Sequence, residues 1–148
     1  MTASTAKLLA TFALATGAAA TGCATRVPDP STSPQASASL ASSAADVVAA
    51  RTGVHPVSAV VFHTTRAKAA TAVDASTGGR AANAPVTVIL FSGTFTDHAA
   101  RVPPGSKAVT GTEISLVYDE NGESTDYGVE TNPVDTSALG DGKTVAVP

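Results

Sequence analysis

The chain has 148 residues, of which 43% are hydrophobic and 14% are charged; its formal net charge is −3 and its pI is near 5.4. This length fits one domain of ordinary size, and an acidic chain without a basic stripe excludes a nucleic-acid-binding role. The sequence holds a single cysteine, which excludes an internal disulfide.

The first 22 residues have the parts of a secretory signal sequence. Lys7 provides a basic start, residues 8–20 form an apolar run, and small residues follow it. The apolar run is too short to span a bilayer comfortably, since a spanning helix needs about 20 residues. We therefore predict that residues 1–22 are a signal peptide.

The only cysteine stands directly after this segment. Ala20-Thr21-Gly22-Cys23 resembles the lipobox of bacterial lipoproteins, although the usual leucine at the first position is Ala20 here. The resemblance implies that Cys23 is acylated, for example with palmitate, and becomes the mature N-terminus on the extracytoplasmic face of the cell membrane. Two or three acyl chains make a durable anchor, because each buried CH₂ group contributes about 0.8 kcal/mol. The alternative is ordinary cleavage after Ala20, which leaves a free thiol.

Residues 23–42 are mostly Ala, Ser, Thr and Pro, and Val27 and Leu40 are their only larger apolar side chains. Such a segment cannot offset its own ordering entropy by burying apolar surface. We predict a disordered tether that holds a domain formed by residues 43–148 away from the membrane.

The predicted domain is α+β, with a short N-terminal helix packed on a small antiparallel sheet of about four strands. Ser43 and Asp46 mark the start of the helix by a capping pattern, and Gly53 marks its end. β-Branched and aromatic residues predict the strands, which are expected at residues 57–65, 86–95, 113–119 and 124–130. Residues 66–84 allow either a short helix followed by a loop or a loop throughout, and residues 144–147 allow a further edge strand.

The hairpin from Glu113 to Glu130 has the most informative pattern. Asn121-Gly122 favours a two-residue type I′ turn, which would pair Leu116 with Tyr127 and Tyr118 with Thr125. One face of this hairpin is then apolar apart from its tip, and the carboxylates of Glu113, Asp119, Asp126 and Glu130 lie on the other face, which we expect to point to water.

No arrangement typical of a catalytic or metal site is present in the sequence. His55, His63 and His98 lack metal-ligand spacing, and a calcium loop around Gly122 would need glycine where Ser124 stands. The sequence also lacks a Gly-x-Ser-x-Gly elbow and a phosphate-binding loop. We therefore predict no metal, no cofactor and no enzymatic activity.

Charge is distributed unevenly along the chain. Residues 44–112 carry six basic and three acidic side chains, a net +3, whereas residues 113–148 carry one basic and eight acidic side chains, a net −7. The acidic hairpin face is either a solvated surface or a binding site for a basic protein or for cations in the cell wall. For the second interpretation, the candidate residues are Glu113, Asp119, Asp126 and Glu130.

The chain carries Tyr118-Asp119-x-x-Gly122, Tyr127-Gly128 and Asp135-x-Ser137-x-Leu139-Gly140. With these motifs it resembles small lipoproteins of high-GC Gram-positive bacteria, and its hairpin is similar to that of PepSY-type domains, whose fold implies a helix on an antiparallel sheet. We expect a tethered binding or accessory module of the cell envelope. The alternatives are a small envelope enzyme with an unrecognised site, or a PepSY-like regulator or inhibitor of a secreted protease.

Cys23→Ala should release the protein from membranes or leave it unprocessed, because the substitution removes the only thiol that can be acylated. Membrane fractionation and mass spectrometry of the mature N-terminus measure the effect, with Thr25→Ala as the control. Wild-type protein that is wholly soluble and carries an unmodified thiol would refute the lipid anchor.

Overall fold

The computed structural model describes residues 33–148, so the signal peptide, Cys23 and residues 24–32 of the predicted tether lie outside the described residues. Two helices and a short 3₁₀ helix enclose one five-stranded antiparallel sheet of order β4-β3-β2-β1-β5. The predicted α+β class is confirmed. In chain order the elements are α1 (Pro34–Thr52), β1 (Ser58–Thr65), α2 (Arg66–Val73), β2 (Pro85–Asp97), β3 (Val109–Asp119), β4 (Ser124–Glu130), η2 (Thr136–Ala138) and β5 (Lys143–Ala146).

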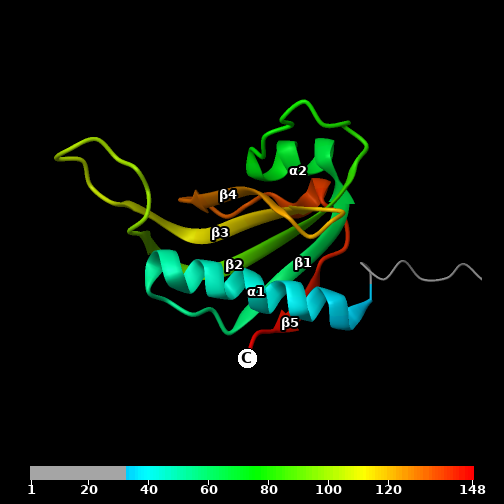
Figure 1. The fold of residues 1–148 in the computed structure, drawn as a ribbon, viewed down its shortest axis with the longest axis horizontal. Coiled ribbons are helices and arrows are strands. Elements are labelled where there is room, and N and C mark those ends of the chain that lie inside the picture. The colour runs from blue at the N-terminus through cyan, green and yellow to red at the C-terminus, as the bar shows by residue number, and fades with distance from the viewer. Residues whose placement is uncertain (1–32) are drawn as a thin grey trace, which may run out of the picture.

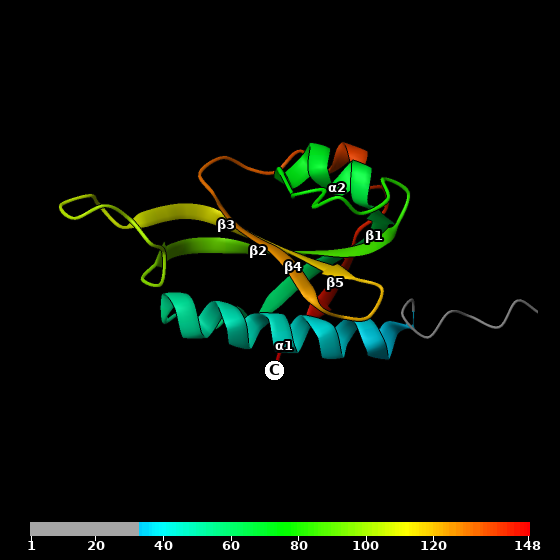
Figure 2. The ribbon, with the colours of Figure 1, turned by 45° about the horizontal axis from the view of Figure 1, so that its top comes forward.

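The elements form three layers. Figure 2 shows α1 along one face of the sheet, with α2 and η2 on the opposite face, and Figure 1 shows the same arrangement from another side. Each helical layer covers its own apolar cluster. Central strand β2 is buried on both faces, as its continuous apolar run predicts.

Helix α1 is longer than predicted. The Ser33 side chain accepts a hydrogen bond from the amide of Ala36 at 3.1 Å, Pro34 occupies the first turn, and Gly53 ends the helix with φ 72°. Residues 34–42, which the sequence analysis assigned to the tether, are therefore helical. Alanine is the best helix former, and this segment gains packing against the sheet that its composition alone does not reveal.

Small side chains bring α1 close to the sheet. Ala41, Ala44 and Ala45 are fully buried, and they lie in one cluster with Phe91 and Leu116 of the sheet. Because the buried face of the helix consists mostly of small residues, it does not stand out from the rest of the helix as an apolar pattern, and the start of the helix at residue 34 could not be read from periodicity.

The segment after β1 is a short helix followed by a loop, which is the first of the two predicted alternatives. The loop folds back on the start of α2, where the amides of Arg66 and Ala67 donate to the carbonyls of Ala84 and Ala82, each at 2.9 Å. These bonds satisfy donors that a helix start leaves open. They replace a side-chain cap, which Thr65 does not provide.

The body of the predicted hairpin register is confirmed. Ile114 lies opposite Val129 and Leu116 opposite Tyr127, and both β3 side chains are fully buried. Val88 and Leu90 are buried as predicted, but Val60 is only partly buried.

The tip of the hairpin differs from the prediction. A bulge shifts the register, so that Tyr118 pairs with Ser124 instead of Thr125. The turn closes with the amide of Gly122 donating to the carbonyl of Asp119 at 3.0 Å, and Gly122 has a positive φ while Asn121 does not. A type I′ turn needs positive φ at both central residues, so the predicted turn type is wrong.

The face of the hairpin expected to point to water is largely covered. Ser115 and Val117 on this face are 2% and 1% exposed, and Val117 belongs to the apolar cluster under α2. Val117 is the one apolar side chain among the polar residues of this face, and it marks the place where a second layer packs.

Ala44→Leu should destabilise the protein by about 1–3 kcal/mol, because the added atoms have no space between α1 and the sheet. Ala50→Leu on the exposed side of the same helix is the matched control, with an expected change near zero. Urea unfolding measures both variants. Equal stability of the two would contradict the close packing of α1.

Candidate functional site

The four carboxylates predicted to bind a partner are half-buried, and each accepts hydrogen bonds within the protein. Glu113 accepts from the amide of Val134 at 2.7 Å and from the hydroxyl of Ser92 at 3.3 Å. Glu130 accepts from the hydroxyl of Ser115 at 3.0 Å. These two carboxylates therefore have neutral partners.

Asp119 and Asp126 are more firmly held. The Asp119 side chain accepts from the amides of Glu123 and Asn121 in the turn, and chiefly the bond from Glu123 lowers the pKa of Asp119 below its usual value. Asp126 forms an ion pair with Arg66 at 2.9 Å and accepts from the amide of Ser76 at 2.8 Å. Both carboxylates thus stabilise local structure, which leaves Glu113 and Glu130 as the more available pair.

Glu113 and Glu130 lie directly opposite each other on β3 and β4. Like charges in such a cross-strand pair repel. The ion pairs found among residues 33–148 do not include either carboxylate. A cation from outside the described chain would relieve this repulsion.

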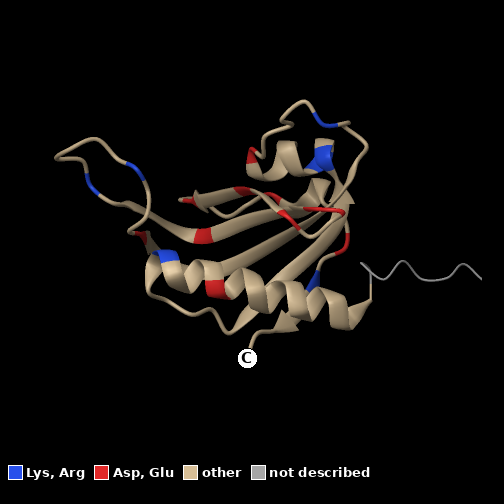
Figure 3. Cartoon of the chain, in the orientation of Figure 1, with Lys and Arg blue, Asp and Glu red and all other residues tan. Residues whose placement is uncertain are grey.

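A groove of about 280 Å³ lies beside this pair, between the end of α2 and β4. Three carboxylates line it, from Asp74, Asp126 and Glu130. Gly128 forms part of its floor: a Cβ atom there would lie 2.6 Å from Oε1 of Glu130, so glycine lets this carboxylate fold back over the strand. Figure 3 shows the acidic residues along the β3–β4 hairpin.

The same groove borders a free sheet edge. β4 has seven residues, pairs with β3 alone and ends the sheet, so one side of its backbone points away from the sheet. Within residues 33–148, no hydrogen bond reaches these outward groups. The opposite edge, β5, has only four residues. β4 is therefore the longer open edge.

A second charged cluster joins α1 to the end of β2. Nη2 of Arg51 lies 2.7 Å from Oδ2 of Asp97, whose side chain is 3% exposed, and the Arg51 guanidinium stacks 4.1 Å from the ring centroid of Tyr127. Desolvation acts to raise the pKa of Asp97, but hydrogen bonds from Arg51 and from the amide of Ala99 outweigh it and lower the pKa. We interpret this cluster as a link between helix and sheet.

His63 lies between two hydroxyl groups. Its Nε2 is 3.1 Å from Oγ of Ser37 and its Nδ1 is 3.2 Å from Oγ1 of Thr87. A serine–imidazole contact is one part of a nucleophilic site. Ser37 is only 4% exposed, however, so a substrate carbonyl cannot approach its oxygen in this arrangement.

Residues 33–148 contain neither a metal-binding cluster nor a membrane-spanning helix. No three side chains of His, Cys, Asp or Glu are grouped so that they could hold a metal ion. No helix in this part of the chain is long and apolar enough to cross a membrane.

Comparisons of the chain with protein-family models, with curated proteins and with solved structures find no match. The resemblance to PepSY-type domains stays a prediction that rests on the hairpin motif.

Two residues that lie beside β4 gave no functional signal in the sequence: Asp74, which lines the groove, and Arg66, which pairs with Asp126. Asp74 ends α2 with a positive φ of 48°, and its distance from the hairpin in sequence gave no signal that it lies there. Arg66 was counted only as one basic residue among six. A lone arginine at the start of an uncertain helix does not reveal that it is buried against β4.

Asp97→Asn should reduce the free energy of unfolding near pH 7 by about 1–3 kcal/mol, because it removes a charged acceptor from Arg51. A lowered folded-state pKa stabilises the protein above the unfolded-state pKa of about 3.9, and this contribution is lost as pH falls through the folded value. The difference between wild type and variant should therefore shrink below about pH 4.

Urea unfolding across this pH range checks the effect, with the exposed Asp141→Asn as the control. A difference that stays constant from pH 7 to acid would contradict the assigned ion pair.

Proposed function

We propose that this protein is a lipid-anchored extracytoplasmic binding module that holds an extended, basic segment of a partner protein. The segment adds to the sheet as a strand beside β4. The observation that carries the proposal is the open edge of β4 next to an acidic groove.

The backbone of β4 supplies the first part of the interaction. Strand addition uses main-chain hydrogen bonds for affinity, while pockets for alternate side chains give specificity. Seven residues of β4 are in strand conformation before any partner binds. The ordering cost therefore falls mainly on the partner.

The two faces of β4 favour different side chains in the partner. Asp126 and Glu130 lie on the α2 side with the groove, whereas Tyr127 and Val129 pack against the apolar cluster under α1. An added strand would meet carboxylates on one face and partly buried apolar groups on the other. A segment that alternates basic and apolar residues matches both faces.

The same charges disfavour a second copy of this chain at the edge. β4 of another copy would bring its own Asp126 and Glu130 toward the first pair, and like charges on neighbouring strands repel. This repulsion also protects the open edge against aggregation. A partner protein with basic side chains removes the repulsion.

A peptide that alternates lysine and valine should bind the protein at low salt and slow the hydrogen exchange of backbone amides in β4. The measurement is exchange followed by NMR, with binding curves at low and high ionic strength, because exposed charge contacts weaken with salt. Amides of β5, at the other edge, provide the internal control and should not change.

The double variant Glu130→Gln/Asp74→Asn should weaken binding by about two- to fivefold per carboxylate, since each exposed contact is worth less than about 1 kcal/mol. Glu120→Gln/Asp141→Asn, at two exposed positions outside the groove, removes the same number of charges and is the control. Binding that protects β5 or α1, or that ignores both salt and the double variant, would refute strand addition. Tighter binding of an anionic or polysaccharide fragment of the cell wall would show that the partner is a component of the cell wall and not a peptide.

A further inference from the structure

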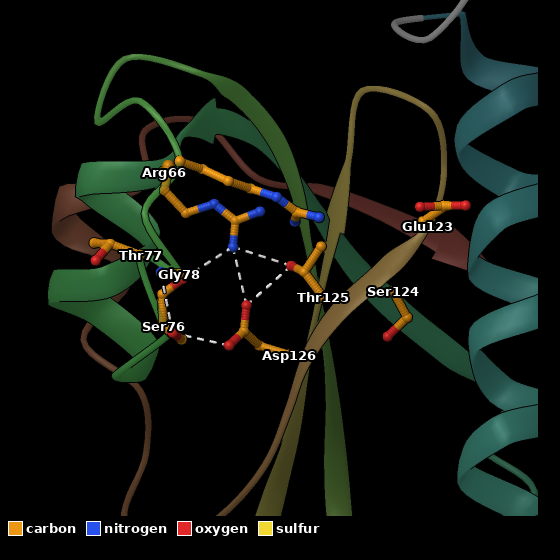
Figure 4. A pocket seen from close by; sticks show the side chains of 9 residues that line it. Arg66, Ser76, Thr77, Gly78, Glu123, Ser124, Thr125 and Asp126 are labelled. Atoms are coloured by element: carbon orange, nitrogen blue, oxygen red, sulfur yellow. Dashed lines mark hydrogen bonds and ion pairs between the residues drawn. The ribbon is translucent and has the colours of Figure 1, made fainter.

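Arg66 is the largest fully buried side chain among the described residues, at 1% exposure. Its Nη1 atom lies near three acceptors: Oδ2 of Asp126 at 2.9 Å, Oγ1 of Thr125 at 3.0 Å and the carbonyl of Ser76 at 3.2 Å. Figure 4 shows the guanidinium reaching from α2 toward Thr125 and Asp126. One nitrogen therefore makes all the polar contacts that hold this side chain.

The other two nitrogens lack partners within residues 33–148. Nε and Nη2 are buried, and no hydrogen-bond acceptor reaches either atom. Only one oxygen of Asp126 contacts Arg66, and it accepts from Nη1. The side of the guanidinium where Nε–H and an Nη2–H point in parallel therefore has no acceptor. This is the side that takes the two oxygens of a carboxylate or phosphate in a bidentate contact.

Arg66 lines a cavity of about 340 Å³ between the loop after α2 and β4. A second guanidinium, from Arg80, lines the same cavity, with a weak ion contact to Asp119 at 3.7 Å and a side chain that is 46% exposed. Residues 76–80 of the loop are all exposed. Movement of this loop and of Arg80 would open the way to the buried nitrogens of Arg66.

We propose that this cavity binds a small organic carboxylate, with Nε and Nη2 of Arg66 donating to its two oxygens and Arg80 providing the second positive charge. The ligand supplies the acceptors that the buried guanidinium lacks. An unpaired buried donor is unfavourable, so filling this position favours binding.

The other charges of the cavity limit the ligand's charge. Asp126 and Glu123 line it as well, so its two guanidinium groups are already balanced by two carboxylates. A phosphate dianion would add two negative charges beside them, whereas a carboxylate adds one. An amino acid fits best, because its ammonium group cancels the negative charge that its carboxylate adds.

The test uses NMR of the whole protein, with the side-chain Nε–H resonance of Arg66 as the reporter and acetate, glycine and inorganic phosphate as separate probes. Acetate and glycine should shift this resonance to saturation, with glycine binding more tightly, and should raise the melting temperature. No saturable shift with either carboxylate would overturn the proposal. Saturation by phosphate at lower concentration than by either carboxylate would also overturn it.

Arg80→Gln should weaken carboxylate binding severalfold while the protein remains folded, because Arg80 is partly exposed. Arg101→Gln, in an exposed loop elsewhere, is the matched control and should bind like wild type. Unchanged binding in Arg80→Gln would contradict the proposed role of Arg80 as the second positive charge of the site. This experiment is independent of strand addition, because Arg80 does not line the groove beside β4.

Discussion

The buried ion pair between Arg66 and Asp126 organises one side of this protein. Arg66 begins α2 directly after β1, and Asp126 lies on edge strand β4, so their contact joins the start of α2 to the margin of the sheet. Removing Asp126 would leave the fully buried charge of Arg66 without its anionic partner, which is destabilising. The pair thus makes the position of α2 depend on a strand that is distant in the sequence.

Both candidate sites follow from this contact. The end of α2 and the loop after it lie beside β4, with the acidic groove on one side of Asp126 and the arginine-lined cavity on the other. Oδ2 of Asp126 pairs with Arg66, while its Oδ1 accepts from the amide of Ser76 in the cavity loop. One carboxylate therefore contacts the walls of both sites.

Charge in this protein serves structure and recognition at different positions. Asp97, Asp119 and Asp126 have cationic or amide partners that hold the fold together. Glu113 and Glu130 face each other with neutral partners only, in a place where no cation of the described chain reaches them. The repulsion between these two carboxylates suits the open strand edge to a basic partner. Binding of a basic side chain would relieve the repulsion and add an attraction between opposite charges.

Local patterns in the sequence were sufficient for the α+β class, the body of the hairpin register and the doubly buried β2, because alternation and apolar runs are properties of neighbouring residues. They failed where packing decided the outcome. The start of α1 is helical because Ser37 and Ala41 are buried on the inner side of the helix, and the polar hairpin face is covered because Val117 and Asp126 meet α2. The groove, the open edge beside it and the cavity around Arg66 combine residues far apart in the chain, so only the tertiary structure could bring them together.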